Sequence, residues 1–454
     1  MSESNHSQPV RTKWADVPFA PKKFPFFYGW VIVCVSTLSI VCSVPGQTAG
    51  IGPYTDYLID ALGVTRKELS LAYLVGTIVS GLILPYAGKL LDKVGVRVMS
   101  VISCLGLAGS LIVLANSGNI NHFLSKYNSS VYVTIGVAGF SFLLVRFFGQ
   151  GNMTMVGRVA MGRWFNHWRG TATAIAGVPI AFAFNAAPWL MNKLIEQFGW
   201  QQTCFLLAGV IGGGMTIIGV LLFRDTPEEC GLTMDGLSET ESVKKDTRQI
   251  HKVYHQFTRA EAVRTMAFWA FVFGLAVYSL VITAVAFHIT SIGEEMGKSK
   301  EESLKMFVYS SFISIPCRFL VSHLVDNTRL KLKYILVGLS LTIFCYILGL
   351  AWFNSDTGHW CTIIGLGLSG GMWGVLCNVT FPRYFGRKHL GAVSGLNMSA
   401  LVIASAVGPA LFYQLKDWLG SFHNASICLA GIPIIMFILA IFADNPQLKK
   451  ECEN

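Results

Sequence analysis

Twelve runs of mostly apolar residues constrain the fold of this chain more than any other feature. A helix needs about 20 apolar residues to cross the hydrocarbon core of a bilayer. Only 13% of the 454 residues are charged, against about 25% in soluble proteins. We therefore expect an all-α membrane protein with twelve transmembrane helices. The runs are 27–48, 69–91, 98–117, 131–156, 168–192, 201–223, 266–291, 304–325, 332–353, 359–381, 390–415 and 422–443.

The lysines and arginines predict how the chain is oriented. Of the 35, 25 fall on the side of both termini and of the polar stretch 224–265, and eight fall on the other side. Arg158, Arg163 and Arg169, which follow the fourth run, are counted among the 25. Basic loops stay in the cytoplasm, so we expect a multi-pass protein of the plasma (cell inner) membrane with both termini cytoplasmic. The net charge of +10 then reflects topology and predicts no nucleic-acid partner.

The two halves of the chain repeat each other. RWFNHWRGTATAIAG, from residue 163, parallels RYFGRKHLGAVSG, from residue 383, and matched glycines and prolines are 221 residues apart. Duplicated six-helix halves are typical of transporters with a substrate site near the midplane between the halves. We expect five parts: tail 1–26, bundle 27–223, linker 224–265, bundle 266–443 and tail 444–454.

The sequence offers little for enzymatic or cofactor chemistry. The 11 cysteines are scattered without a CxxC pair, so neither a zinc site nor a disulfide framework is indicated. No phosphate-binding loop and no Ser/His/Asp constellation stands out. We expect no metal, no cofactor and no enzymatic activity, and a monomer in the lipid bilayer.

Two motifs give the chain a family resemblance. GKLLDKVGVR (88–97) resembles the signature loop of the major facilitator superfamily, and RFFGQG (146–151) resembles its fourth-helix motif. FPFFYGW (24–30), RDTPEECGL (224–232) and FPRYFGRKHLGAVSG (381–395) are similar to the oxalate/formate antiporter and monocarboxylate transporter branch. The resemblance implies two pseudo-symmetric six-helix bundles and a small organic anion as substrate.

The same resemblance assigns a role to Arg318. In that branch an arginine of the eighth helix often binds the substrate carboxylate, and Arg318 matches its place. Two positions depart from the branch. The eleventh run has Asn397 and no central basic residue, and Ser314 stands where proton-coupled members can carry an aspartate. These departures argue against dianion exchange and against a carboxylate proton relay.

Arg318 is also unusual on physical grounds. It precedes Asp326 by eight residues, which places it about 12 Å inside the membrane boundary. Burying an arginine there costs about 2.5–3.5 kcal/mol, and its planar fork fits a carboxylate. An anchor for a substrate anion and a tie between helices both remain open. The same two roles are open for Arg146, for which the resemblance implies a partly architectural role.

The loop after the second run predicts a conformational latch. Gly88 and Gly95 permit a tight turn and close backbone approach, and Asp92 can cap a helix end or pair with Lys93 or Arg97. Asp326 and Arg329 form the second-half counterpart, in which Ser322 replaces a glycine and suggests a weaker latch. The expected gating residues are Gly88, Asp92, Lys93, Gly95, Arg97, Asp326 and Arg329.

Further polar residues in apolar runs are candidates for the substrate cavity or for ties between helices. His288 could carry a proton near neutral pH, and Asp56 could titrate in an outer vestibule. Simple structural roles remain equally open for both. The candidate substrate-binding residues are Arg318, Arg146, Tyr73, Gln150, Tyr278, Ser314, Asn378 and Asn397.

These observations favour a secondary active transporter of a small organic anion. A monocarboxylate such as lactate, pyruvate or formate is the expected substrate, moved by alternating access with proton symport or anion exchange. An exporter of drug-like solutes and a non-transporting membrane sensor are the alternatives. An exporter would be expected to carry an embedded acid, which the spans almost entirely lack.

Overall fold

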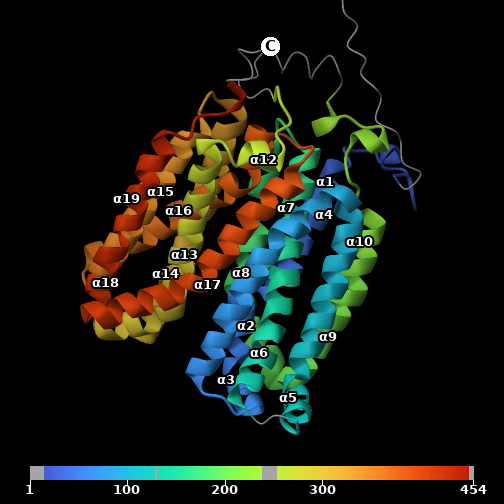
Figure 1. Ribbon diagram of the computed structural model, residues 1–454. Helices are drawn as coiled ribbons and strands as arrows, with labels where there is room; N and C mark the ends of the chain where they lie inside the picture. Colours follow the sequence, from blue (N-terminus) through green and yellow to red (C-terminus); the bar gives the residue numbers. More distant parts are fainter. Residues whose placement is uncertain (1–14, 128–129, 238–252, 449–454) are drawn as a thin grey trace, which may run out of the picture.

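Long helices account for most of the chain in the computed structural model, which describes residues 15–127, 130–237 and 253–448. Figure 1 shows them running side by side in two groups. Ten helices are long and apolar enough to cross a membrane. One of them holds two of the expected spans, and the first expected span is present as the shorter helix α1 (Gly29–Cys42). The twelve expected segments are therefore all helical.

The first segment is interrupted in its middle. Helix α1 (Gly29–Cys42) is followed by a 3₁₀ turn, Val44–Gly46, and by the short helices α2 (Thr48–Ile51) and α3 (Thr55–Leu62). Pro45 lies in the turn, where a proline cannot donate to an α-helical ladder. The break leaves backbone carbonyls of the turn free to accept hydrogen bonds from side chains.

The second and third segments form α4 (Arg66–Ala115), a run of 50 residues that bends at Gly95. Gly95 has φ 85° and ψ 167°, outside the helical region. A Cβ at this position would lie 2.4 Å from Oδ1 of Asp225, so only glycine fits. The bend lets the chain leave one span and enter the next without a loop.

The fourth segment is longer than its apolar run. Helix α6 (Val131–Val145) continues through a π-helix, Arg146–Met153, into α7 (Thr154–Trp164). The segment therefore ends eight residues beyond the predicted end at 156. Arg158, the first basic residue after the apolar run, consequently lies within the helix and not in a loop.

The remaining helices complete the two groups. They are α5 (Ser117–Ser125), α8 (Arg169–Phe198), α9 (Trp200–Gly209), α10 (Thr216–Leu222), α12 (Arg259–Ala262), α13 (Met266–Glu295), α14 (Lys300–Asn327), α15 (Leu332–Ala351), α16 (Asp356–Phe385), α17 (Leu390–Leu419), α18 (Phe422–Leu429) and α19 (Gly431–Ile441). A π-turn, Val210–Met215, joins α9 to α10.

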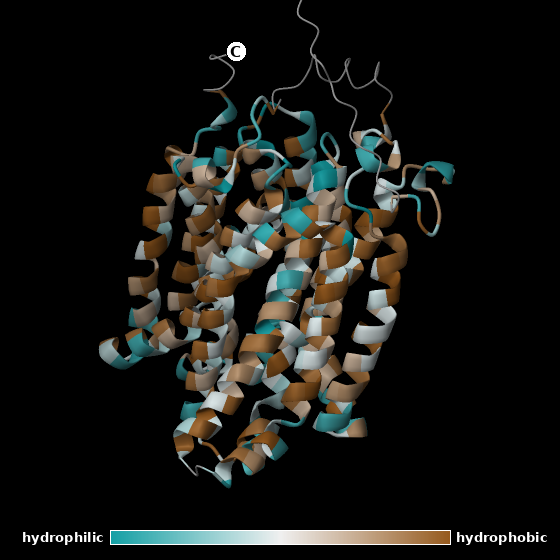
Figure 2. Ribbon diagram, turned by 45° about the vertical axis from the view of Figure 1, so that its right-hand side comes forward, coloured by the Kyte–Doolittle hydropathy of each residue, from teal (hydrophilic) through white to brown (hydrophobic). Residues whose placement is uncertain are grey.

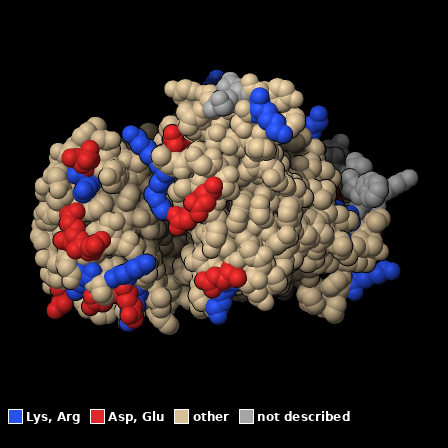
Figure 3. All heavy atoms as spheres, turned by 90° about the horizontal axis from the view of Figure 1, so that it is seen from below, with Lys and Arg blue, Asp and Glu red and all other residues tan. Residues whose placement is uncertain are grey.

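The two groups touch mainly through two helix pairs, α4 with α17 and α8 with α14. The groups converge at the end that carries α12 and diverge toward the opposite end (Figure 1). Apolar residues cover the middle of the helices, and hydrophilic residues concentrate toward the ends (Figure 2). Seen from the diverging end, acidic and basic side chains lie interspersed (Figure 3), so this end carries no basic surface.

Candidate functional site

The converging end, called the latch end below, is closed by Asp92 of α4. Its carboxylate accepts hydrogen bonds from the backbone N–H groups of Gly391 and Ala392, both at 2.7 Å. These groups belong to the first turn of α17, where the positive end of the helix dipole favours an anion. Arg163, at the end of α7, completes the site with an ion pair to Asp92 at 2.9 Å.

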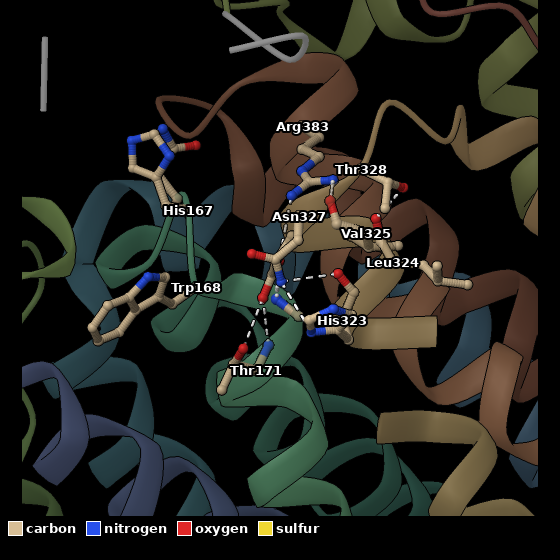
Figure 4. Close-up of polar contacts among 12 residues, drawn as sticks. His167, Trp168, Thr171, His323, Leu324, Val325, Asn327, Thr328 and Arg383 are labelled. Carbon is tan, nitrogen blue, oxygen red and sulfur yellow. Dashed lines mark hydrogen bonds and ion pairs between the residues drawn. The ribbon is translucent and has the colours of Figure 1, made fainter. Parts of the chain in front are cut away.

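A second latch repeats this geometry in the other helix pair. Asp326 of α14 accepts hydrogen bonds from the N–H groups of Gly170 and Thr171, at 2.9 and 2.7 Å, and from the Thr171 hydroxyl at 2.9 Å. Arg383 lies 3.5 Å from the carboxylate and donates to the carbonyl oxygen of Val325 at 3.0 Å. Figure 4 shows Thr171 and Arg383 converging on the end of α14. The second latch has no fewer contacts than the first.

The ion-pair partners differ from those that the sequence suggested. Asp92 pairs with Arg163 and not with Lys93 or Arg97, and Asp326 pairs with Arg383 and not with Arg329. The correct partners lie at the ends of α7 and α16, far away in the sequence.

The other expected gating residues have different surroundings. Gly88 meets the carbonyl oxygen of Gly391 so closely that a Cβ would lie 2.2 Å from it. Lys93 and Arg329 are exposed. Arg97 donates to the carbonyl oxygens of Val220 and Val17, at 2.6 and 2.8 Å.

Two linker residues that the sequence did not single out hold the turns beside the latches. Asp235, which is buried, accepts from the N–H groups of Asn166, His167 and Trp168, between α7 and α8. Gln256 accepts from the N–H groups of Arg387 and Lys388, between α16 and α17, at 2.8 and 3.1 Å. The sequence does not reveal which backbone N–H groups a polar side chain will face, because that depends on how distant segments pack.

Arg146 lies between the groups, toward the middle of the fourth segment. Its guanidinium, fully buried, donates to the carbonyl oxygen of Gly46 at 3.1 Å, to the Thr48 hydroxyl at 3.3 Å and to the Ser405 hydroxyl of α17 at 3.0 Å. Tyr73 stacks beneath it, 5.3 Å from the ring centre. Gln150 donates to the same Ser405 at 3.4 Å. This cluster brings together three of the candidate residues, Arg146, Tyr73 and Gln150, and its acceptors are all neutral.

Arg318 reaches from α14 across to the opposite group. A Cβ at Gly177 of α8 would lie 1.8 Å from its Nη1, so the guanidinium occupies the space that a side chain would fill there. Its hydrogen bond to the carbonyl oxygen of Gly370 is long, 3.5 Å, and its buried Nε has no hydrogen-bond partner. Two further candidates, Tyr278 and Ser314, border the same place, since both hydroxyls lie within about 3.2 Å of a Cβ built on Gly370.

Arg158 is a second arginine of this site that the sequence missed. It was assigned to the cytoplasmic surface because the apolar run ends at 156. That prediction is wrong, because the helix continues and Arg158 lies on α7 facing the other group. Its guanidinium sits 5.2 Å from the ring centre of Trp373 and donates to the sulfur of Met398 at 3.7 Å. Trp373 in turn packs against Tyr278, which lies beside Arg318, with ring centres 5.0 Å apart.

None of the remaining candidates forms a hydrogen bond or ion pair with the arginines of the centre among the contacts of the described residues, although Gly374, to which Asn378 bonds, lies against Arg318. Asn378 donates to the carbonyl oxygen of Gly374 on its own helix at 3.0 Å, and Asn397 is buried within α17. His288 bonds to the carbonyl oxygen of Pro409 at 3.0 Å among aromatic rings of the second group. Asp56 forms an exposed ion pair with Arg66 near the diverging end, and the geometry does not bring it to the arginines.

The electrostatics of the centre are therefore one-sided. Within the described residues, no ion pair joins an acid to Arg146, Arg158 or Arg318. No described cluster of histidine, cysteine and acidic residues could hold a metal ion. Three buried or half-buried cations without a carboxylate make a place suited to an anion, since desolvated charges in a membrane are paired or functional.

Comparisons with known proteins bear on the family and the fold. The family model described as Major Facilitator Superfamily matches residues 33–409. A relative in Bacillus subtilis (strain 168), described as the uncharacterized MFS-type transporter YcxA, is 22% identical over 407 residues, covering 87% of this chain and 90% of YcxA.

Two solved structures share the fold. The human organic anion transporter MFSD10 has a TM-score of 0.64 at 14% identity, with 91% of this chain and 99% of MFSD10 covered. The E. coli fucose:proton symporter FucP has a TM-score of 0.61 at 12% identity, with 92% and 98% covered.

Proposed function

Because the chain belongs to the Major Facilitator Superfamily, we propose that it is a secondary active transporter of a small organic anion. The observation that carries the proposal is Arg318, a charged fork at the interface of the two groups that has no carboxylate among the described residues. Arginine stays charged and binds a carboxylate bidentately. The substrate then supplies the counter-ion that the protein lacks.

The latches give the proposal its mechanism. Asp92 and Asp326 bind the opposite group and hold the latch end together. We therefore expect the substrate to enter the site from the diverging end. Transport requires both latches to release while the diverging ends come together, which is alternating access. The basic bias of the loops supports a cytoplasmic latch end in a plasma or inner membrane. Since His288 is tied to a backbone carbonyl, coupling by exchange or by a proton carried with the substrate is favoured over a histidine relay.

Uptake into proteoliposomes tests this function. Labelled lactate, pyruvate and formate are offered to the purified full chain with and without a pH gradient, beside a cationic dye. We expect carboxylate uptake that Arg318→Ala lowers at least about 100-fold, because each hydrogen bond to a charged group contributes about 1.5–3 kcal/mol. Arg318→Lys should retain part of it, since the charge stays and the fork is lost.

Arg66→Gln is the matched control, because Arg66 is exposed and remote from the centre. It should leave uptake unchanged. Transport of the dye alone would show that the substrate class is wrong, and carboxylate uptake that survives Arg318→Ala would remove Arg318 as the anchor.

A further inference from the structure

Arg158 gives the central site a second positive charge that faces Arg318 from the opposite group. Arg158 belongs to α7 and contacts Trp373 of α16 and Met398 of α17. Arg318 belongs to α14 and lies against Gly177 of α8. Arg158 of the first group thus contacts the second group, and Arg318 of the second group contacts the first. Both side chains cross the interface that alternating access must open.

Two aromatic rings lie between the two arginines and connect them into one site. Trp373 lies over Arg158 and packs against Tyr278, with ring centres 5.0 Å apart. Tyr278 lies beside Arg318, because its hydroxyl lies 3.1 Å from a Cβ built on Gly370 and Arg318 donates to the carbonyl oxygen of Gly370. The two charges are therefore neighbours across a short apolar and aromatic wall.

If Arg158 had a purely structural role, its N–H donors would be left with weak acceptors. Sulfur is a weak acceptor, and the guanidinium of Arg158 donates to the sulfur of Met398 at 3.7 Å. The indole of Trp373 can stabilise the cation through its face, but it accepts none of the planar N–H donors. Two neighbouring like charges repel each other, and no acid among the described residues pairs with either, so an anion that enters between them stabilises both.

We propose that Arg158 and Arg318 bind opposite ends of one substrate, which therefore carries two acidic groups, as a small dicarboxylate does. This inference rests on the proposed function and narrows the small organic anion to a dicarboxylate, whereas the sequence favours a monocarboxylate. Such an anion would neutralise one arginine of each group at once.

Ligand-induced thermal stabilisation of the detergent-purified full chain tests the inference independently of transport direction, because a ligand that binds the folded state raises its melting temperature. The probes are pairs with the same number of carbons: propionate with malonate, butyrate with succinate and valerate with glutarate, plus formate and oxalate as the smallest members. We expect at least one dicarboxylate to act at a concentration at least tenfold lower than its partner. The same pairs then compete for uptake in proteoliposomes.

Variants of Arg158 assign the effect. Arg158→Gln should abolish the preference for the dicarboxylate, because it removes the second positive charge of the site. Arg158→Lys, which keeps the charge, should retain part of the preference and guards against a variant that fails to fold. Arg66→Gln is the control and should leave the preference intact.

The outcomes separate this inference from the proposed function. Monocarboxylate uptake that depends on Arg318, with no dicarboxylate preferred or with a preference that survives Arg158→Gln, would overturn the inference alone. No anion bound or transported at all would overturn both. A preference lost in both Arg158→Gln and Arg318→Ala supports the two-ended site.

Discussion

At the latch end, Arg163 and Arg383 each face a carboxylate, whereas in the centre Arg158 and Arg318 face none that belongs to the described part of the chain. The latches also repeat, since Asp92 and Asp326 are 234 residues apart and their arginine partners are 220 apart.

The centre does not repeat. At the same spacings Arg158 corresponds to Asn378 and Arg318 to Leu84. The duplicated halves thus share the parts that close the molecule, while each half contributes a different arginine to the place where a substrate would bind. At the latches the arginines are neutralised by aspartates of the protein, whereas in the proposed binding site the counter-charge is left to the substrate.

The largest expected effect comes from breaking both latches. Asp92→Asn and Asp326→Asn should each lower uptake by a similar factor, about tenfold, because the two carboxylates make comparable contacts. The double variant should lose at least about 100-fold, since each lost bond to a charged group is worth about 1.5–3 kcal/mol. Labelling of the buried Cys377 by a membrane-impermeant maleimide, followed by peptide mass spectrometry, reports opening and should rise in the double variant.

Asp56→Asn, at the opposite end, serves as the control for the latch variants. Strongly unequal effects of the two single substitutions would show that the halves do not contribute equally, and unchanged Cys377 labelling would show that the latches do not hold this end closed.

An aspartate introduced beside Arg318 should give the centre the kind of ion pair that the latches have. Ser314→Asp places a carboxylate one turn before Arg318 and supplies the missing counter-ion. We expect about tenfold or more loss of anion uptake at pH 8 together with a higher melting temperature. Protonation removes the added charge, so uptake should recover as the pH falls toward the pKa of the new carboxyl group.

Ser314→Asn is the matched neutral control for that substitution. If the aspartate costs no more uptake than the asparagine at any pH, the free charge of Arg318 is not what binds the anion.

A smaller effect is expected from filling the space that Arg318 uses. In Gly177→Ala the new Cβ would lie 1.8 Å from Nη1, so the guanidinium must shift. The half-saturating anion concentration should rise about tenfold with little change in melting temperature, because alanine suits the helix. Gly136→Ala, with no atom within 4 Å of the added Cβ, is the control. Equal uptake kinetics for the two variants would place Arg318 outside the anion's path.

The smallest effect should come from Ser405, the neutral acceptor shared by Arg146 and Gln150. Hydrogen bonds between membrane helices average about 0.6 kcal/mol, so Ser405→Ala should change uptake by about threefold or less. Ser369→Ala removes a hydroxyl that bonds only within its own helix and is the comparison. A loss as large as that of Arg318→Ala would move Arg146 from a tie between helices to the binding site.

Hydropathy, the repeat and the motif at 88–97 were enough to predict the fold, because bilayer thickness leaves few ways to place twelve apolar runs. The depth of Arg318 followed from counting residues back from Asp326. Both inferences use distances along one helix, which a sequence displays directly.

The partners across helices could not be predicted in this way. Arg163 and Arg383 meet their aspartates only after helices from distant parts of the chain pack together. Arg158 was misplaced because the apolar run ends before the helix does, and a helix that packs on protein tolerates polar residues beyond the run. Asp235 and Gln256 cap turns whose free N–H groups are a property of the folded backbone.

The π-helix at Arg146–Met153 has a consequence for the ancestry of the site. A bond from i to i+5 takes one more residue into a turn than an α-helical bond, so the twelve residues from Arg146 to Arg158 rotate about as far as eleven in a regular helix. At about 100° per residue, this brings both side chains to within about 20° of one face, against about 120° without it. Both arginines accordingly meet α17, at Ser405 and Met398. A chain shorter by one residue in this stretch would keep its helix and its composition and yet turn Arg158 away from Arg318, so one inserted residue is enough to create the second charge of the site.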